Sequence, residues 1–435
     1  MTSTFPYSSL SRLGTASLRS ATTASLSHLL QRPPTFGTED RIVLDIGSLY
    51  IKVGFGGEPR PRHIISFREF LHQDRQTPSD QQLVELYNQD LMRENNAMER
   101  VEFMLGGALQ DVYFRYLLAD PSQHKVIICE SPMIPIKVKE IIASILFHRF
   151  HIPTISFLPN HLLALLTTGK MTGLVIDCGH LETIVLPISF AIPLSNALKT
   201  TPLAGRAVAS RLKELLKNHA SIIDASSHSS ISVYPHRQVL DSSLTSELIQ
   251  DIQLQCLFVS PTGADGMTED IGDSDNKNSH ANDVYYRLKG KDGILVIPGW
   301  VREHAAEILF SPIDEELCSI GECVLDAVLK VPRDLRRELI SSILLIGGSS
   351  MMAGFQTRLH NNLVGKIKLA KYSKICGLLP SINFFDISSK SGQVFPRNSR
   401  AWVGGSLVGA LQLSGQAVNR EQFDGSVPDW TRPML

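Results

Sequence analysis

Two aspartates in matching turns are the residues of this chain best suited to chemistry. Asp45 and Asp177 each end a hydrophobic segment and each begins an Asp-x-Gly turn, with Gly47 and Gly179. Lys52 follows the first turn within a second alternating segment. Carboxylates hold hard divalent cations, often through water, and a glycine turn lets backbone N–H groups approach phosphate closely. The pattern predicts a site for a nucleoside triphosphate, with Asp45 and Asp177 holding its metal through water.

A third glycine-containing element extends this candidate site. Gly347, Gly348 and Ser349 follow the apolar segment ILLI, and we expect a helix to open beside them, where its N-terminal N–H groups favour phosphate or ribose. Ser48, next to Gly47 in the first turn, is a further candidate contact for phosphate. One Asp-x-Gly is usually only a turn, but two at equivalent strand ends, with a later strand and glycine pair, favour a binding site.

The two strand–turn–strand units predict two similar α/β domains that face each other across one shared site. The length of 435 residues accommodates two such domains. We expect an outer part of the first domain to be reduced at about residues 67–100, because this stretch is polar and lacks apolar periodicity. The predicted boundaries are a disordered tail at 1–37, a first domain at 38–167 plus 399–435, and a second domain at 168–398 with mobile insertions at about 218–243 and 260–283.

Composition excludes several classes of function. The net charge of −1 argues against a dedicated nucleic-acid binder, and no apolar run is long enough to span a bilayer. Residues 1–37 are rich in Ser and Thr and lack acidic residues, which overlaps the composition of a mitochondrial transit peptide. We favour a disordered, phosphorylatable tail.

Three weaker patterns have ordinary structural interpretations. The six cysteines are expected to be reduced and buried, because Cys318 and Cys323 have no partners that would complete a zinc site. His304 and Glu307 are expected to form an exposed pair, since no metal motif surrounds them. The basic run at 366–374 predicts a solvated face, with an acidic protein partner as the alternative.

Apolar periodicity predicts most of the remaining elements. A buried strand is expected at 125–130 and a hairpin around residues 291–293. The closing segment at 399–413 is expected to form a glycine turn that runs into an apolar helix returning to the first domain. Helices are predicted at 82–92, 101–117, 136–150, 160–169, 203–216, 315–329, 335–342 and from residue 354.

The motifs in this order resemble the actin superfamily, and among its members an actin-related protein. The resemblance rests on DIGSLYIKVGFGG, TGLVIDCG, LAGR, IGGSSMMAGF and AWVGGS, and it runs from about residue 41 to the C-terminus. AWVGGS separates this chain from the sugar kinases and chaperone ATPases of the superfamily. The resemblance implies a ribonuclease H-like duplicated, two-domain α/β fold with a central nucleotide cleft, and ATP or ADP with Mg²⁺ as its ligand.

Departures from actin affect both hydrolysis and binding. Asn160 aligns with the glutamine that positions the attacking water, and Ile184 aligns with its histidine partner. A displacement of about 1 Å in such a role costs on the order of a hundredfold in rate, so we expect weak or absent ATP hydrolysis and no catalytic residues.

Other departures fall on the nucleotide contacts. Leu49 replaces a phosphate-loop glycine, His180 and Leu181 replace an acidic residue and a glycine, and Gln253-Leu254 replaces the Lys-Glu pair that contacts adenosine. Retention and loss of nucleotide binding are both compatible with this pattern.

Within the actin-related proteins the chain is most similar to the branch at the pointed end of dynactin, on the segments DIQLQCLFVS, LVIDCGHLETIVLPI and VPDW. Residues 67–100 also lack the loop with which actin grips its filament neighbour. The resemblance implies a cytoplasmic, cytoskeletal cap on the dynactin actin-related minifilament that holds other pointed-end subunits and, indirectly, supports dynein-dependent transport on microtubules. Two alternatives remain open: an active ATPase of the superfamily, and a nuclear actin-related subunit of a chromatin-remodelling complex.

Overall fold

The computed structural model describes residues 41–71, 86–87, 97–223, 237–261, 281–288, 293–314, 316–385, 395–413 and 417–431. The tail at 1–37 and nearly all of the insertion at 260–283 therefore lie outside the described residues. Of the helix predicted at 82–92, only Leu86 and Tyr87 are described, and they form a turn. Most of residues 67–100, where a gripping loop is expected to be missing, likewise lies outside the described residues.

The first sheet is built around the first Asp-x-Gly turn. Its central strand β1 (Ile42–Ile46) is fully buried, pairs antiparallel with β2 across the turn, and pairs parallel with β4 on its other side. The strand order is β15-β5-β4-β1-β2-β3. The other strands span Tyr50–Phe55 (β2), His63–Ser66 (β3), Val126–Glu130 (β4), Thr154–Pro159 (β5) and Ala417–Asn419 (β15).

The second sheet repeats this arrangement around the second turn. β6 (Gly173–Cys178) pairs antiparallel with β7 (Thr183–Ser189) and parallel with β14 (Ile343–Ile346), as β1 does with β2 and β4. β7 also pairs with β8 (Ile192–Pro193) and β9 (Lys199–Thr201). The predicted duplicated α/β fold is therefore confirmed, with each Asp at the end of the corresponding strand.

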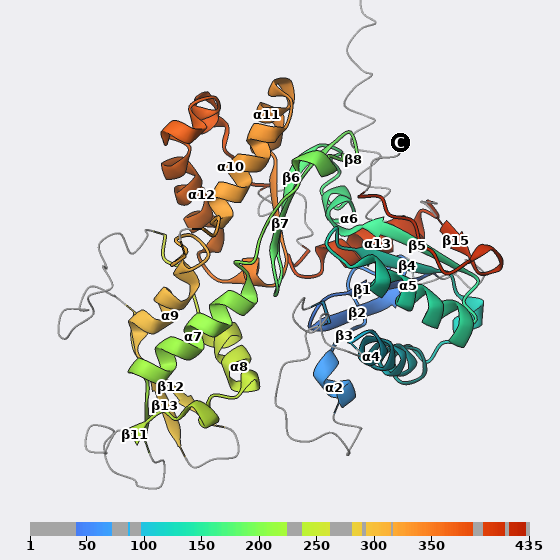
Figure 1. Ribbon diagram of the computed structural model, residues 1–435, viewed down its shortest axis with the longest axis horizontal. Coiled ribbons are helices and arrows are strands. Elements are labelled where there is room, and N and C mark those ends of the chain that lie inside the picture. Colours follow the sequence, from blue (N-terminus) through green and yellow to red (C-terminus); the bar gives the residue numbers. More distant parts are fainter. Residues whose placement is uncertain are drawn as a thin grey trace, which may run out of the picture.

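Helices surround the two sheets, and a further group of helices lies beside the small sheet that contains β12 (Val284–Arg287) and β13 (Ile294–Ile297) (Figure 1). α4 and α5 lie beside the first sheet, α10, α11 and α12 lie at the top of the second domain, and α7, α8 and α9 lie below them. The bounds are Phe67–Leu71 (α2), Ala97–Asp111 (α4), Ile136–Ser144 (α5), Asn160–Leu166 (α6), Gly205–His219 (α7), Ser246–Cys256 (α8), Gly299–Glu307 (α9), Ile320–Lys330 (α10), Arg333–Ile340 (α11), Phe355–Lys366 (α12) and Arg400–Ala410 (α13). None of the described helices is long and apolar enough to cross a membrane.

Part of the predicted insertion at 218–243 is regular structure. β10 (Ser221–Ile223) and β11 (Arg237–Gln238) join β12 (Val284–Arg287) and β13 (Ile294–Ile297) in a sheet of order β11-β10-β13-β12. The prediction missed β10 and β11 because strands of two or three residues are too short to show periodicity. The pairing of β12 with β13 confirms the predicted hairpin.

Two predicted helix starts were wrong. α10 begins at Ile320 rather than at residue 315, because Ser319 and Glu322 form a reciprocal capping box there. α13 begins at Arg400, so the predicted glycine turn lies inside the helix. A Cβ on Gly404 would overlap the backbone carbonyl of Leu163 in α6. The glycines therefore permit close helix packing rather than a turn.

Side-chain burial corrects two further expectations. Glu307 is buried rather than exposed, since both of its carboxylate oxygens accept hydrogen bonds from Arg358 of α12, at 3.2 and 2.8 Å. Cys318 and Cys376 are exposed, whereas the other four cysteines are buried, and all six are free. No group of three or more His, Cys, Asp and Glu side chains that could hold a metal occurs among the described residues.

Candidate nucleotide site

The two Asp-x-Gly turns have the same local geometry. The N–H of Gly47 donates to the carbonyl of Tyr50 at 2.9 Å, and the N–H of Gly179 donates to the carbonyl of Glu182 at 3.1 Å. A Cβ on either glycine would lie 3.2 Å from that same carbonyl oxygen, which is a tight contact. Glycine at these positions therefore follows from the tightness of each turn.

Backbone donors remain available at the tips of both turns. Among the described residues, the N–H groups of Ser48 and Leu49 in the first turn have no acceptor, and neither do those of Leu181 and Glu182 in the second. Unpaired N–H groups at adjacent turn positions are the typical donors for phosphate oxygens. The sequence prediction placed Ser48 in this set but missed the other three residues, because backbone donors leave no signature in residue type.

Asp45 and Lys52 form the charged centre of the first turn. They face each other across the pairing of β1 with β2, and Lys52 Nζ lies 2.6 Å from Asp45 Oδ2. Burial disfavours the charged ammonium, but the nearby negative charges, Asp45 foremost and then Asp177, together raise the pKa of Lys52. Lys52 is therefore a fixed positive charge, and its contact in this structure is the Asp45 carboxylate.

Asp177 brings a second carboxylate to the same place. Burial, and then the charge of Asp45, raise the pKa of Asp177 to about 6, although Lys52 and a hydrogen bond from Asn160 favour its charged form. Burial, followed by the charge of Asp177, raises the pKa of Glu182 to about 7. Asp45 and Asp177 thus share the Lys52 ammonium, and two carboxylates beside one ammonium leave a surplus of negative charge that suits a divalent cation.

Gly347–Ser349, the third predicted element, packs against the second Asp-x-Gly turn. Gly347 has φ +88°, and a Cβ there would overlap the carbonyl of Cys178 and lie 2.6 Å from Asp177 Oδ1. Ser349 Oγ donates to the carbonyl of Gly179 at 2.7 Å. Gly348 has open space around its Cα. These glycines and Ser349 therefore line the site next to Asp177.

The helix expected beside Gly347–Ser349 is absent from this position. Ser349–Met351 form a single 3₁₀ turn, and α12 begins only at Phe355 after Gly354, whose φ is +82°. The helix predicted from residue 354 is confirmed as α12, whereas the expectation that a helix opens beside Gly347–Ser349 was wrong, because the turn at Gly354 separates the two segments. The site therefore lacks an α-helix N-terminus at this point.

Asn160 and His161 are further residues of the site. Asn160 Nδ2 donates to Asp177 Oδ2 at 3.0 Å, while Asn160 Oδ1 lies 2.5 Å from His161 Nδ1. Burial lowers the pKa of His161 to about 3, so its ring is neutral. His161 was missed because nothing in the sequence distinguishes it from a core histidine. Ile184, paired with Asp177 across β6 and β7, is apolar and buried.

Direct contacts join the two domains at the rim of the site. Gln250 Nε2 of α8 donates to Tyr50 Oη of β2 at 2.6 Å. Burial raises the pKa of the Tyr50 phenol. The charge of Arg68 opposes this shift, and the charge of Asp251 adds to it. Asp45 itself is 9% exposed.

The contacts expected for adenosine are not reproduced. Gln253 Nε2 is bonded to the carbonyl of Gly205 at 3.1 Å, and Leu254 is 71% exposed. The donor set thus fits the phosphate chain and metal of a nucleotide better than its base.

Comparisons with known proteins agree with this architecture. The family model described as Actin matches residues 37–430. Actin-related protein 10 of Dictyostelium discoideum is 27% identical over 92% of this chain and 88% of its own length. Actin-like protein 7A is 26% identical in Rattus norvegicus and 25% in Mus musculus, each over 87% of this chain and 79% of the relative. The chain belongs to the actin family.

Proposed function

We propose that this chain is a structural actin-related subunit that caps the pointed end of the dynactin minifilament and holds other pointed-end subunits. Membership of the actin family and similarity to an actin-related protein along most of the chain support this proposal. The motif resemblance to the pointed-end branch of dynactin supplies the specific assignment. Through dynactin the subunit would support dynein-dependent transport in the cytoplasm.

The hydrogen bonds of Asn160 are the main observation that supports a structural rather than a hydrolytic role. Its amide is bonded at both ends, to Asp177 through Nδ2 and to His161 through Oδ1, so that these two partners set its orientation. Ile184, at the position of the missing histidine, has no proton to exchange. A hydrolytic site needs a group held within hydrogen-bond reach of the water; Ile184 cannot supply one, and Asn160 is oriented by Asp177 and His161 instead.

ATP or ADP with Mg²⁺ fits this site as a structural ligand. The backbone N–H groups of Ser48, Leu49 and Leu181 would hold phosphate oxygens. Asp45 and Asp177 would hold the metal through water, as hard cations prefer. The bound cation would neutralise the surplus carboxylate charge, and the phosphates would join one turn to the other.

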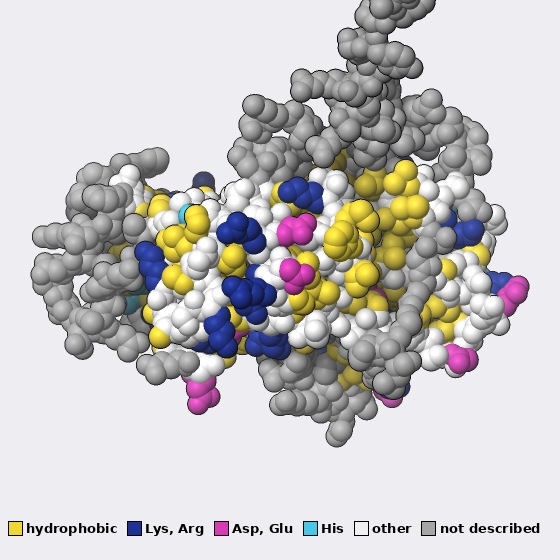
Figure 2. Space-filling model, turned by 90° about the horizontal axis from the view of Figure 1, so that it is seen from above, with side chains coloured by type: hydrophobic (Ala, Val, Ile, Leu, Met, Phe, Trp, Pro, Cys, Tyr) yellow, Lys and Arg dark blue, Asp and Glu magenta, His cyan; other side chains and the backbone are white. Residues whose placement is uncertain are grey.

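The upper face of the molecule has the character of a docking surface. Lys and Arg side chains gather over the helices of the second domain, and hydrophobic side chains gather beside them (Figure 2). The hairpin between β7 and β8 contributes Phe190 and Ile192, which are 71% and 64% exposed, and Met171, 57% exposed, is bonded to it through its backbone. Clustered exposed apolar side chains are typical of protein-binding surfaces.

A matched pair of substitutions tests the proposal. Phe190→Asp should reduce recovery of dynactin subunits with the tagged chain, because it places a charge on the docking face. Phe103→Asp is the control, since Phe103 of α4 is also 71% exposed and lies on another part of the molecule. Quantitative mass spectrometry of the purified complexes measures the result. Equal recovery with both variants would contradict the assigned face.

The same purification separates the alternatives. Recovery of remodelling ATPases in place of dynactin subunits would identify a nuclear subunit. Steady phosphate release from the purified chain, abolished by Asp177→Ala, would identify an active ATPase.

A further inference from the structure

A pocket on the β14 side of the second domain is lined by side chains other than those of the nucleotide site. Its volume is about 510 Å³, and it lies between β14, the turn before α12 and the start of α13. The walls are mainly apolar, from Leu344, Phe384, Phe385, Phe395 and Met352. Two arginines, Arg397 and Arg400, are the charged residues among its lining.

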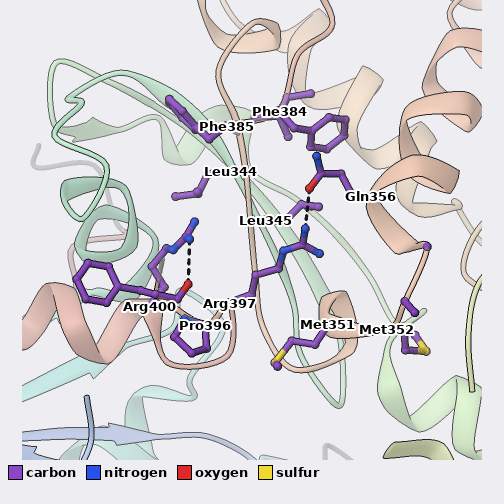
Figure 3. Close-up of a pocket in the computed structure, with 14 residues that line it drawn as sticks. Leu344, Leu345, Met351, Met352, Gln356, Phe384, Phe385, Pro396, Arg397 and Arg400 are labelled. Carbon is purple, nitrogen blue, oxygen red and sulfur yellow. Dashed lines mark hydrogen bonds between the residues drawn. The ribbon is translucent and has the colours of Figure 1, made fainter. Parts of the chain in front are cut away.

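Arg400 is a buried cation with no counter-charge among the described residues. It is 3% exposed, its Nη2 donates to the backbone carbonyl of Phe395 at 3.0 Å, and its Nε is buried without a partner. Figure 3 shows its guanidinium rising toward Leu344, with Phe385 beyond. Within the described residues neither Arg400 nor Arg397 forms an ion pair.

The surroundings of Arg400 add positive charge. Arg397 donates to the carbonyl of Ser350 and to Gln356 Oε1, both at 2.6 Å, so that its own bonds go to neutral acceptors. Arg400 is also the first residue of α13, whose first turn contains no acidic residue. A cation there opposes the helix dipole. Burial, and then the charge of Arg397, lower the pKa of Arg400 to about 10, which leaves it protonated at neutral pH.

A buried, unpaired guanidinium is costly, and an anion in the adjoining pocket removes this cost. The planar fork of arginine matches the two oxygens of a carboxylate. The apolar walls favour a ligand whose remaining surface is hydrophobic, and the volume lies within the range of small-molecule sites. We propose that this pocket binds a carboxylate carried on an apolar group, with the carboxylate on Arg400 and the apolar group against Leu344 and Phe385.

Thermal denaturation of the full-length chain with phenylbutyrate tests the proposal. The acid should raise the melting temperature by several degrees in a saturable manner, and its neutral amide, phenylbutyramide, should not. Arg400→Gln should abolish the response to the acid. Arg400→Lys, which keeps the charge but loses the fork, should weaken binding by about tenfold.

A second variant keeps the test valid if the arginine variants do not fold. Leu344→Trp fills the pocket without changing charge and should also abolish the response to phenylbutyrate. Equal responses to acid and amide, a response to inorganic phosphate as large as that to the acid, or no response to any of them would overturn the proposal. A response that persists in both Arg400→Gln and Leu344→Trp would overturn the assigned location.

The carboxylate has two possible sources, a free acid or an acidic side chain of a protein partner. Purification of the tagged native chain with and without phenylbutyrate distinguishes them. Loss of a copurifying protein on addition of the acid identifies a partner side chain, whereas an unchanged set of proteins identifies a free acid. This result does not depend on whether the chain caps dynactin, because it is read from competition and not from the identity of the complex.

Discussion

Replacing Asp177 with asparagine should stabilise the free protein at neutral pH. The ordinary pKa of this carboxyl is 3.8, and burial with the charge of Asp45 raises its pKa in the folded protein to about 6. The folded state therefore binds the proton more tightly than the unfolded state. The stability from this group is fully present below pH 3.8 and is lost as pH rises through about 6.

The size of the effect follows from the two pKa values. One pKa unit corresponds to about 1.36 kcal/mol, so the difference between 3.8 and about 6 is worth about 3 kcal/mol. Asp177→Asn removes this penalty, and its side-chain oxygen still accepts the hydrogen bond from Asn160. The variant should exceed the native chain by up to about 3 kcal/mol above about pH 7, and the difference should vanish below about pH 4.

Urea denaturation in EDTA without nucleotide, across this pH range, measures the difference. Glu102→Gln, an exposed carboxyl of α4, is the matched control and should change stability by less than about 0.5 kcal/mol. Adding Mg²⁺ with ATP should stabilise the native chain more than Asp177→Asn, because the cation needs the carboxylate. A variant no more stable than the native chain at neutral pH would refute the surplus of negative charge at this site.

Three further substitutions, the first with a matched control, test packing, ion pairing and hydrolysis. Gly404→Ala should lower the unfolding free energy by about 1–3 kcal/mol through overpacking. Gly107→Ala, where the added methyl group meets nothing within 4 Å, should raise the unfolding free energy by up to about 1 kcal/mol. Urea denaturation compares the two variants. Glu307→Ala should cost about 3–5 kcal/mol because Arg358 is left buried and unpaired, and a loss below 1 kcal/mol in the same assay would contradict this. Asn160→Gln should raise single-turnover phosphate release by about tenfold by restoring the missing methylene, and an unchanged rate would show that Asn160 is not limiting.

Local patterns in the sequence predicted the framework of the site because they depend on neighbouring residues. The strand ahead of Asp45 is buried on both faces, so that it appears as a continuous apolar run. The tight turns at Gly47 and Gly179 fix glycine by sterics alone, which makes them visible in the sequence. The matching pair of units then follows from repetition of this pattern.

Features that depend on distant residues could not be predicted in the same way. The burial of Glu307 requires Arg358, 51 residues away, and the contact between Tyr50 and Gln250 spans 200 residues. Gly404 in α13 resembled a turn residue because the group that requires a glycine there, the carbonyl of Leu163, belongs to another helix. Nothing in a single sequence records which of its segments meet.

The site separates the requirements of binding from those of hydrolysis. Binding needs charge and backbone donors, and these persist in Asp45, Lys52, Asp177 and the unpaired N–H groups of the two turns. Hydrolysis needs a free polar group beside the attacking water, and Asn160 is instead fixed between Asp177 and His161. A ligand at this site would therefore act by neutralising carboxylates and holding two domains together. Such a role favours a long-lived closed state, which suits a subunit that ends a filament better than one that cycles through nucleotide states.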